Sequence, residues 1–215
     1  MEIKDELKKA LAELRKEKVR KFDQTVELIV NLKKFNTKKE SLNTIIYVPH
    51  KIKEKKIAAF LDIKNQKVFT ITESEFDKFK DKKEMKSLTK KYDFFISQAR
   101  LMPKVATVFG KILGPTGKMP SPQLGIVMNA DDKIIEELKD KINKSVKIRT
   151  KEASIKVSIG KQSMKDEDLA ENIFTIYNSL IKELPRGKEN IKDVKIKFTM
   201  TKPYKISSKW TLTNQ

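Results

Sequence analysis

The sequence predicts two domains: a split α+β sandwich domain formed by both ends of the chain, and an α/β domain inserted between them. Three observations support this fold class. A helix and alternating strands begin the chain, short strands and helices alternate from about residue 54, and the first pattern returns after Thr150. Since 215 residues can bury two modest cores, we expect residues 1–53 plus 151–215 to form domain I and residues 54–150 to form domain II, a three-layer α/β domain.

The first third contains one expected helix and two expected strands. Apolar residues recur at intervals of three and four from Ile3 to Leu14, which predicts a basic amphipathic helix ending near Arg20. Residues 25–32, TVELIVNL, alternate apolar and polar side chains, as a half-buried strand does. TIIYVP at 44–49 predicts a second strand, and we expect the two strands to be antiparallel neighbours.

The middle third alternates short apolar strands with helices, which predicts a small parallel sheet. The expected strands are KIAAFLDI at 56–63, KVFTI at 67–71, DFFIS at 93–97 and VKIRT at 146–150, and the expected helices are at 73–92, 101–113 and 131–142.

The last third repeats the style of the first. Residues 154–160, SIKVSIG, and 194–200, VKIKFTM, predict strands, and a helix is expected from Asp166 to Leu184. The apolar stripe of that helix needs a sheet to cover it, so both ends of the chain should build one domain.

The charge of the chain favours a polyanionic partner. Lysine and arginine total 48 against 29 acidic residues, a net charge of +19. The excess is +6 in residues 1–53, +8 in 54–150 and +5 in 151–215, so both folded domains should present positive surface. Mixed-sign networks for heat stability would balance the two signs better. Nucleic acid is therefore the partner to consider first.

Composition also excludes several classes of site. The chain has no cysteine and only one histidine, His50, so disulfides, thiol chemistry and a histidine or cysteine metal cluster are not expected. No apolar run approaches a membrane span, and the N-terminus lacks the apolar core of a signal peptide. We expect a soluble, intracellular protein without metal or membrane contact.

The segment ILGPTGKMPSP at 112–122 concentrates glycine and proline beside a lysine. A phosphate-binding P-loop needs glycine five positions before Gly117 and serine or threonine after Lys118, but Ile112 and Met119 occupy these positions. We therefore interpret the segment as a stiff loop after a helix. The alternative is an α/β enzyme whose middle domain binds a nucleotide, although the chain shows no convincing nucleophile, histidine base or metal cluster.

Four separated blocks of the sequence resemble the archaeal form of the ribosomal protein L-one family of the large subunit. They are KFDQTVELIVNLKK, YDFFISQARLMPKVATVFGKILGPTGKMPSP, ASIKVSIGKQSMKDEDLAENI and LPRGKENIKDVKIKFTMTKPYKI, in the family's order. The resemblance covers nearly the whole chain.

The resemblance implies a fold and a function. It implies the inserted architecture, with a Rossmann-like domain II. It also implies a cytoplasmic, ribosome-associated RNA-binding protein that is not an enzyme, needs no cofactor and is monomeric when free. Its partners would be the stalk helices of large-subunit rRNA, exit-site tRNA and the mRNA of its own operon, whose translation it would repress. An unspecific RNA chaperone is the other alternative.

The resemblance also implies that domain I holds the RNA. The matching positions are Phe22, Thr25, Glu27, Lys151, Thr199 and Met200, and Lys202 is placed for an additional phosphate contact.

These residue types suit structured RNA. The hydroxyls of Thr25 and Thr199 suit ribose 2′-hydroxyls, and the carboxylate of Glu27 accepts from base amino groups. Taken alone, Glu27 would be a solvated strand residue, and Phe22 and Met200 would be core residues.

Thr201 stands where the family usually has glycine. A β-branched residue disfavours positive φ, so we expect it to add bulk facing a ligand and to hinder close approach of RNA.

Overall fold

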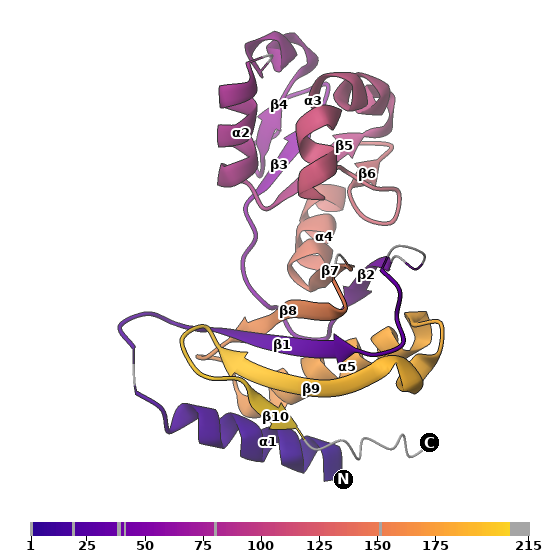
Figure 1. Cartoon of the computed structure of the whole chain (residues 1–215). Helices are drawn as coiled ribbons and strands as arrows, with labels where there is room; N and C mark the ends of the chain where they lie inside the picture. Colours follow the sequence, from indigo (N-terminus) through magenta and orange to yellow (C-terminus); the bar gives the residue numbers. More distant parts are fainter. Residues whose placement is uncertain are drawn as a thin grey trace. The chain divides into compact units, whose positions relative to one another are not determined.

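The computed structural model describes residues 2–18, 20–37, 40, 42–79, 81–150 and 152–206. The chain forms two compact units, drawn in Figure 1. The split unit comprises the described residues of Met1–Lys53 and Lys144–Gln215, and the inserted unit comprises those of Glu54–Asn143. No helix in the described part of the chain is both long and apolar enough to cross a membrane.

The split unit is built on a four-stranded antiparallel sheet with the order β10-β9-β1-β8. The central strand β1 (Thr25–Leu32) has the predicted bounds. Its neighbours come from the last third of the chain: β8 (Ser154–Lys161), β9 (Ile191–Phe198) and β10 (Tyr204–Ile206).

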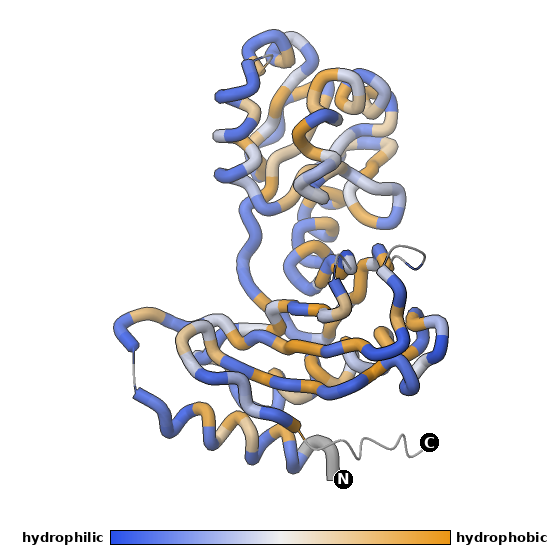
Figure 2. The backbone as a smooth tube through the Cα atoms, in the orientation of Figure 1, coloured by the Kyte–Doolittle hydropathy of each residue, from blue (hydrophilic) through white to orange (hydrophobic). Residues whose placement is uncertain are grey.

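One face of this sheet is buried by two helices. Helix α1 (Glu2–Arg15) ends earlier than Arg20, and α5 (Asp166–Glu183) has nearly its predicted length. The apolar stripes of both helices join the alternating apolar residues of β1 in one core. Figure 2 shows such an alternation of hydrophobic and hydrophilic residues along β9. A short 3-10 helix, Gly187–Asn190, precedes β9.

The second predicted strand forms but has a different partner. Strand β2 (Asn43–Tyr47) pairs antiparallel with β7 (Ser145–Arg149), so the expected pairing of the first two strands is wrong. Both edges of β1 are already filled by β8 and β9. Strand β7, expected in the parallel sheet, therefore belongs to the split unit, and the inserted unit ends at Asn143.

The inserted unit contains the predicted parallel sheet, with the order β4-β3-β5-β6. Its strands are β3 (Ile57–Phe60), β4 (Phe69–Ile71), β5 (Phe94–Gln98) and the two-residue β6 (Ile126–Val127). Its helices are α2 (Lys82–Lys91), α3 (Met102–Thr116) and α4 (Asp132–Asn143), with short 3-10 helices at Glu73–Phe79 and Ala99–Leu101.

The core of the inserted unit is aromatic. The rings of Phe76 and Phe95 lie against Phe60, each with a centroid separation of 5.8 Å, and Phe109 approaches it to 4.8 Å. The helix expected over 73–92 is two elements, because the Asp81 carboxylate accepts a hydrogen bond from Lys83 N at 3.1 Å and starts α2 there.

The glycine–proline segment is helical for longer than expected. Helix α3 continues through Gly114 and Pro115 and ends at Gly117, whose φ of 72° is left-handed. Gly114 has no such φ, so its role is different. Proline disfavours helical geometry at the preceding residue because its ring meets that residue's Cβ, and Gly114 has no Cβ. The stiff loop therefore begins only at Gly117.

Lys118 stabilises the contact between two helices. Its ammonium donates to Thr89 O at 2.6 Å and Tyr92 O at 2.7 Å, at the C-terminal end of α2. A P-loop lysine instead precedes a helix, whose N-terminus attracts phosphate. Here the glycine and lysine follow α3, and the ammonium of Lys118 is bonded to two carbonyls instead of being presented to a phosphate.

Replacing Gly117 should destabilise the inserted unit, whereas replacing Gly110 should not. Gly117→Ala forces a Cβ into the left-handed region, so we expect it to lower the free energy of unfolding by about 1 to 2 kcal/mol. Gly110 lies within α3 and an added Cβ meets nothing within 4 Å, so Gly110→Ala should raise stability by about 0.5 to 1 kcal/mol. Urea denaturation measures both changes, and equal losses would contradict this account.

Replacing Lys118 should affect stability and not nucleotide affinity. Lys118→Met keeps the apolar stem but leaves the two carbonyls without their charged donor, at a cost of about 1.5 to 3 kcal/mol in thermal or urea unfolding. Calorimetry with ATP and GTP should detect no binding in either protein. Nucleotide binding by the parent that is lost in Lys118→Met would support the enzyme alternative instead.

Candidate nucleic-acid interface

The described candidate residues gather at one end of the split unit's sheet. Thr25 is the first residue of β1, and Thr199 and Met200 form the turn after β9, whose last residue Phe198 lies opposite Val26. Lys202 follows in the same connection, and Phe22 precedes β1. Lys151 lies outside the described residues.

Two hydrogen bonds join the two threonines. The Thr199 hydroxyl accepts from Thr25 N at 3.0 Å and lies 3.4 Å from Thr25 O, to which it donates. These bonds extend the ladder between β1 and β9 by one side chain. The polar rim of the sheet end is therefore held in place before any ligand arrives.

Two large apolar side chains are exposed beside the threonines. Phe22 exposes 52% of its surface and Met200 exposes 56%, so the alternative in which both are core residues is wrong. Phe22 lies three residues before Thr25 in the sequence, and an exposed aromatic ring suits an unpaired base, which can stack on it.

Glu27 lies on the open face of the sheet. It is half-buried, it alternates with the buried Val26 and Leu28, and its cross-strand partners are Ser158 on β8 and Lys197 on β9. A carboxylate there accepts hydrogen bonds and donates none, so it would favour base amino groups over phosphates.

Sequence reasoning did not identify the lysines around Glu27. Lys156 of β8 and Lys195 and Lys197 of β9 alternate with buried residues, which places them on the same open face as Glu27. The signal for them is the alternation in SIKVS and VKIKF, whose lysines take the polar positions. Two carboxylates, Glu27 and Asp193, lie among these three ammonium groups, and Asp193 Oδ1 is 4.0 Å from Lys195 Nζ, so the face keeps a smaller net positive charge.

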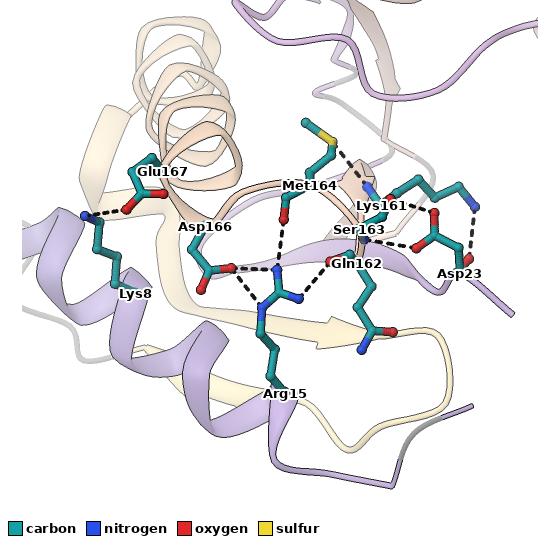
Figure 3. A network of polar contacts seen from close by, with 9 residues as sticks. All are labelled: Lys8, Arg15, Asp23, Lys161, Gln162, Ser163, Met164, Asp166 and Glu167. Atoms are coloured by element: carbon teal, nitrogen blue, oxygen red, sulfur yellow. Dashed lines mark hydrogen bonds and ion pairs between the residues drawn. The ribbon is translucent and has the colours of Figure 1, made fainter. Parts of the chain in front are cut away.

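Lys161, at the end of β8, also lies beside one of the candidate residues. Its ammonium contacts the Thr25 hydroxyl at 3.1 Å and Asp23 O at 3.4 Å, and the Asp23 carboxylate accepts from Ser163 N and Oγ (Figure 3). The preceding Gly160 is required by close packing, because a Cβ there would meet Leu169 Cδ2 at 2.5 Å.

Arg15 anchors the loop that follows Lys161. Its guanidinium donates to Asp166 Oδ1, Gln162 O and Met164 O at 2.7 to 2.9 Å (Figure 3). Such charge-assisted, multiple bonds fix geometry as well as adding energy. The end of α1 and the start of α5 are thereby tied to the loop that carries Ser163.

Gln24 holds the turn after β9. It exposes only 2% of its surface, its Oε1 accepts from Met200 N at 3.0 Å, and its Nε2 donates to Gln162 Oε1 at 3.2 Å. Since buried amides left unsatisfied are costly, these bonds specify where Met200 lies.

Thr201 does not face a ligand, contrary to expectation. It is 9% exposed, and its hydroxyl accepts from Phe198 N at 2.9 Å. Of the residues described, Lys34 is the one non-glycine residue with positive φ, so Thr201 needs no left-handed backbone. Its hydroxyl closes the end of β9, and its bulk points into the unit.

Comparison with known proteins identifies the family of the chain. The model of the ribosomal protein L1p/L10e family matches residues 14–202. A large ribosomal subunit protein uL1 of Nanoarchaeum equitans is 38% identical over 206 residues, covering 91% of this chain and 95% of that protein. The uL1 proteins of Pyrococcus abyssi and Thermofilum pendens are 34% and 36% identical, covering 88% and 95% of this chain and 89% and 92% of their own lengths. The match over most of the chain, together with these full-length relatives, shows that the chain belongs to the ribosomal protein L1p/L10e family.

Proposed function

We propose that this protein binds the stalk region of large-subunit rRNA through the end of the split unit's sheet. As a member of the L1p/L10e family, it is a structural, non-enzymatic protein of the large ribosomal subunit, and its place is on cytoplasmic ribosomes. The observation that carries the proposal is the grouping of exposed Phe22 and Met200 with the bonded hydroxyls of Thr25 and Thr199.

The surface combines affinity with selectivity. Lys195, Lys197 and Lys202 supply positive charge that attracts any phosphate backbone. Thr25 and Thr199 hold hydroxyls in fixed positions, where a ribose 2′-hydroxyl distinguishes RNA from DNA. Glu27 repels phosphates and accepts from bases, so a folded RNA that presents amino groups there is preferred.

The resemblance extends the proposal to two further RNAs. Exit-site tRNA would contact the protein while it is bound to the ribosome, and an mRNA that imitates the stalk structure would occupy the same surface of the free protein. Both depend on shape-specific recognition, which the preformed turn at Met200 favours.

Removing specific contacts should weaken RNA binding without changing its salt dependence. Thr199→Val and Glu27→Ala should each cost about 1 to 3 kcal/mol in affinity for stalk RNA, because each loses one well-formed contact. Neither change removes a positive charge, so the slope of log Kd against log salt should stay the same. Lys202→Ala should instead flatten that slope by about one unit.

One control and one further binding-site variant separate these effects from a general loss. Glu183→Gln, an exposed change on α5, should leave affinity unaltered. Lys151→Ala, at the matching position outside the described residues, should behave as Lys202→Ala does. If all four binding-site variants respond alike, and an unstructured RNA competes equally, the protein is an RNA chaperone and the proposal is wrong.

The split unit should fold and bind stalk RNA by itself. A chain that joins residue 53 to residue 144 through a short linker keeps β7 beside β2, and it should retain most of the affinity of the full protein. A join to residue 151 removes β7 and leaves β2 unpaired, so it should unfold at lower urea. Titration calorimetry measures the RNA affinity of each shortened chain, and urea denaturation measures its stability. If the chain joined at residue 144 folds but does not bind stalk RNA, the proposal is wrong.

A further inference from the structure

An exposed aromatic ring lies on an edge strand of the inserted unit, whereas the RNA surface proposed above belongs to the split unit. Phe69 is the first residue of β4, the outermost strand of the parallel sheet, and it exposes 45% of its surface. An exposed large apolar side chain of this kind needs an explanation when it lies beside other features of a binding site.

The Phe69 ring is held rigidly from one side. It stacks on Tyr92, with ring centroids 5.0 Å apart and planes 19° apart, and Tyr92 is 7% exposed within the aromatic core. One face of Phe69 is therefore covered by a fixed ring, while much of the side chain remains open to solvent. A flat ring that is already ordered loses little entropy when a ligand stacks on it.

Two hollows flank this ring. One, of about 460 Å³, is lined by Phe69, by residues of the loop before β4, and by Glu75, Lys78 and Phe79 of the 3-10 helix Glu73–Phe79. The other, of about 380 Å³, shares Phe69, Lys78 and Phe79 and adds Leu88, Lys91 and Tyr92 of α2 and its end. Both are open, and together they surround Phe69 with space for planar groups.

The charges beside the ring favour an anion. Lys91 Nζ lies 5.7 Å from the centroid of Phe69 and 5.6 Å from that of Tyr92. Within the part of the chain that the structure describes, no ion pair involves Lys78 or Lys91. Both ammonium groups therefore remain available to an external anion.

The carboxylates that line the hollows only partly offset these charges. Glu75 is bonded to Lys64 at 3.0 Å and to Thr72 N at 3.2 Å, and the bond from Lys64 lowers its pKa. Glu84 lines the second hollow, but it lies on α2 among five lysines. The surroundings of Phe69 are thus basic on the side of α2.

We propose that the inserted unit has a second nucleic-acid site, in which an unpaired base stacks on Phe69 and the adjacent phosphates contact Lys78 and Lys91. Stacking tolerates any base, and the ammonium groups follow the backbone, so the ligand class is single-stranded nucleic acid without strong sequence preference. This site goes beyond the proposed stalk interface and does not depend on it, because the two lie in different units.

Tryptophan fluorescence tests the site directly. The chain has a single tryptophan, Trp210, so the full-length double variant Trp210→Phe, Phe69→Trp reports from the proposed platform alone. The matched control is Trp210→Phe, Ile63→Trp, since Ile63 is 81% exposed in the same unit and lines neither hollow. The probe is an oligouridylate of about ten nucleotides.

We expect saturable quenching of the tryptophan at position 69 by the oligouridylate and none at position 63. Adding Lys91→Gln should raise the oligouridylate concentration at half-maximal quenching several-fold. It should also flatten the slope of log Kd against log salt by about one unit. In the otherwise unaltered chain, Phe69→Leu keeps an apolar side chain on Tyr92 and should lower the yield of photocrosslinks between a 4-thiouridine probe and the inserted unit by about tenfold. Stalk RNA affinity should stay unchanged.

Other outcomes overturn the site. Absence of quenching at position 69, or equal quenching at positions 63 and 69, shows that no base stacks there in particular. Quenching of the same size by poly-glutamate shows an unspecific anion surface or a site for acidic protein. Loss of stalk RNA affinity in Phe69→Leu would mean that the two surfaces are one. If the sites are separate, adding Thr199→Val to the reporter chain weakens stalk RNA binding and leaves the quenching at position 69 unchanged.

Discussion

The split unit depends on the pairing of β1 at both of its edges with strands from the last third of the chain. Leu28 lies opposite Val157 on β8 and Ile196 on β9, so each residue pair between β1 and these neighbours joins positions more than a hundred residues apart. A lone β1 would leave its backbone groups and its apolar face unsatisfied. The helices α1 and α5 then cover one face, and the chain between the two halves must form a unit of its own.

The same pairing builds the proposed RNA surface. Antiparallel strands bring the start of β1 next to the ends of β8 and β9, which is why Thr25 meets both Thr199 and Lys161. Backbone pairing sets the approximate place of these side chains. Buried polar residues set the rest: Gln24 fixes the turn at Met200, and Arg15 fixes the loop that follows Lys161. Thr201 adds a hydroxyl that closes β9, so a β-branched residue fits without disturbing the exposed face.

The two proposed nucleic-acid sites, one in each unit, differ in their chemistry. The split unit combines fixed hydroxyls, a carboxylate and lysines, which together suit a folded RNA with defined donors and acceptors. The inserted unit presents a flat ring supported by Tyr92 with ammonium groups beside it, which suits a flexible strand. The positive charge in both units is consistent with this division, since neither surface relies on a basic tail.

Periodicity in the sequence determined the local elements of this protein. The alternation in TVELIVNL predicted β1 with its observed bounds, strand–helix alternation predicted the parallel sheet, and the four matching blocks predicted the family. These features are local because a strand or helix shows in its own residues which of its faces is buried.

Only the tertiary structure decided which elements meet. The partner of β2 is β7, the lysine after Gly117 binds carbonyls at the end of α2, and Lys161 reaches Thr25 from another strand. A sequence pattern shows that a face needs covering or that a charge needs a partner, but hydrogen bonds and ion pairs depend on distances between residues far apart in the chain. Those distances exist only once the two edges of β1 have been filled and the remaining strands have taken the places that are left.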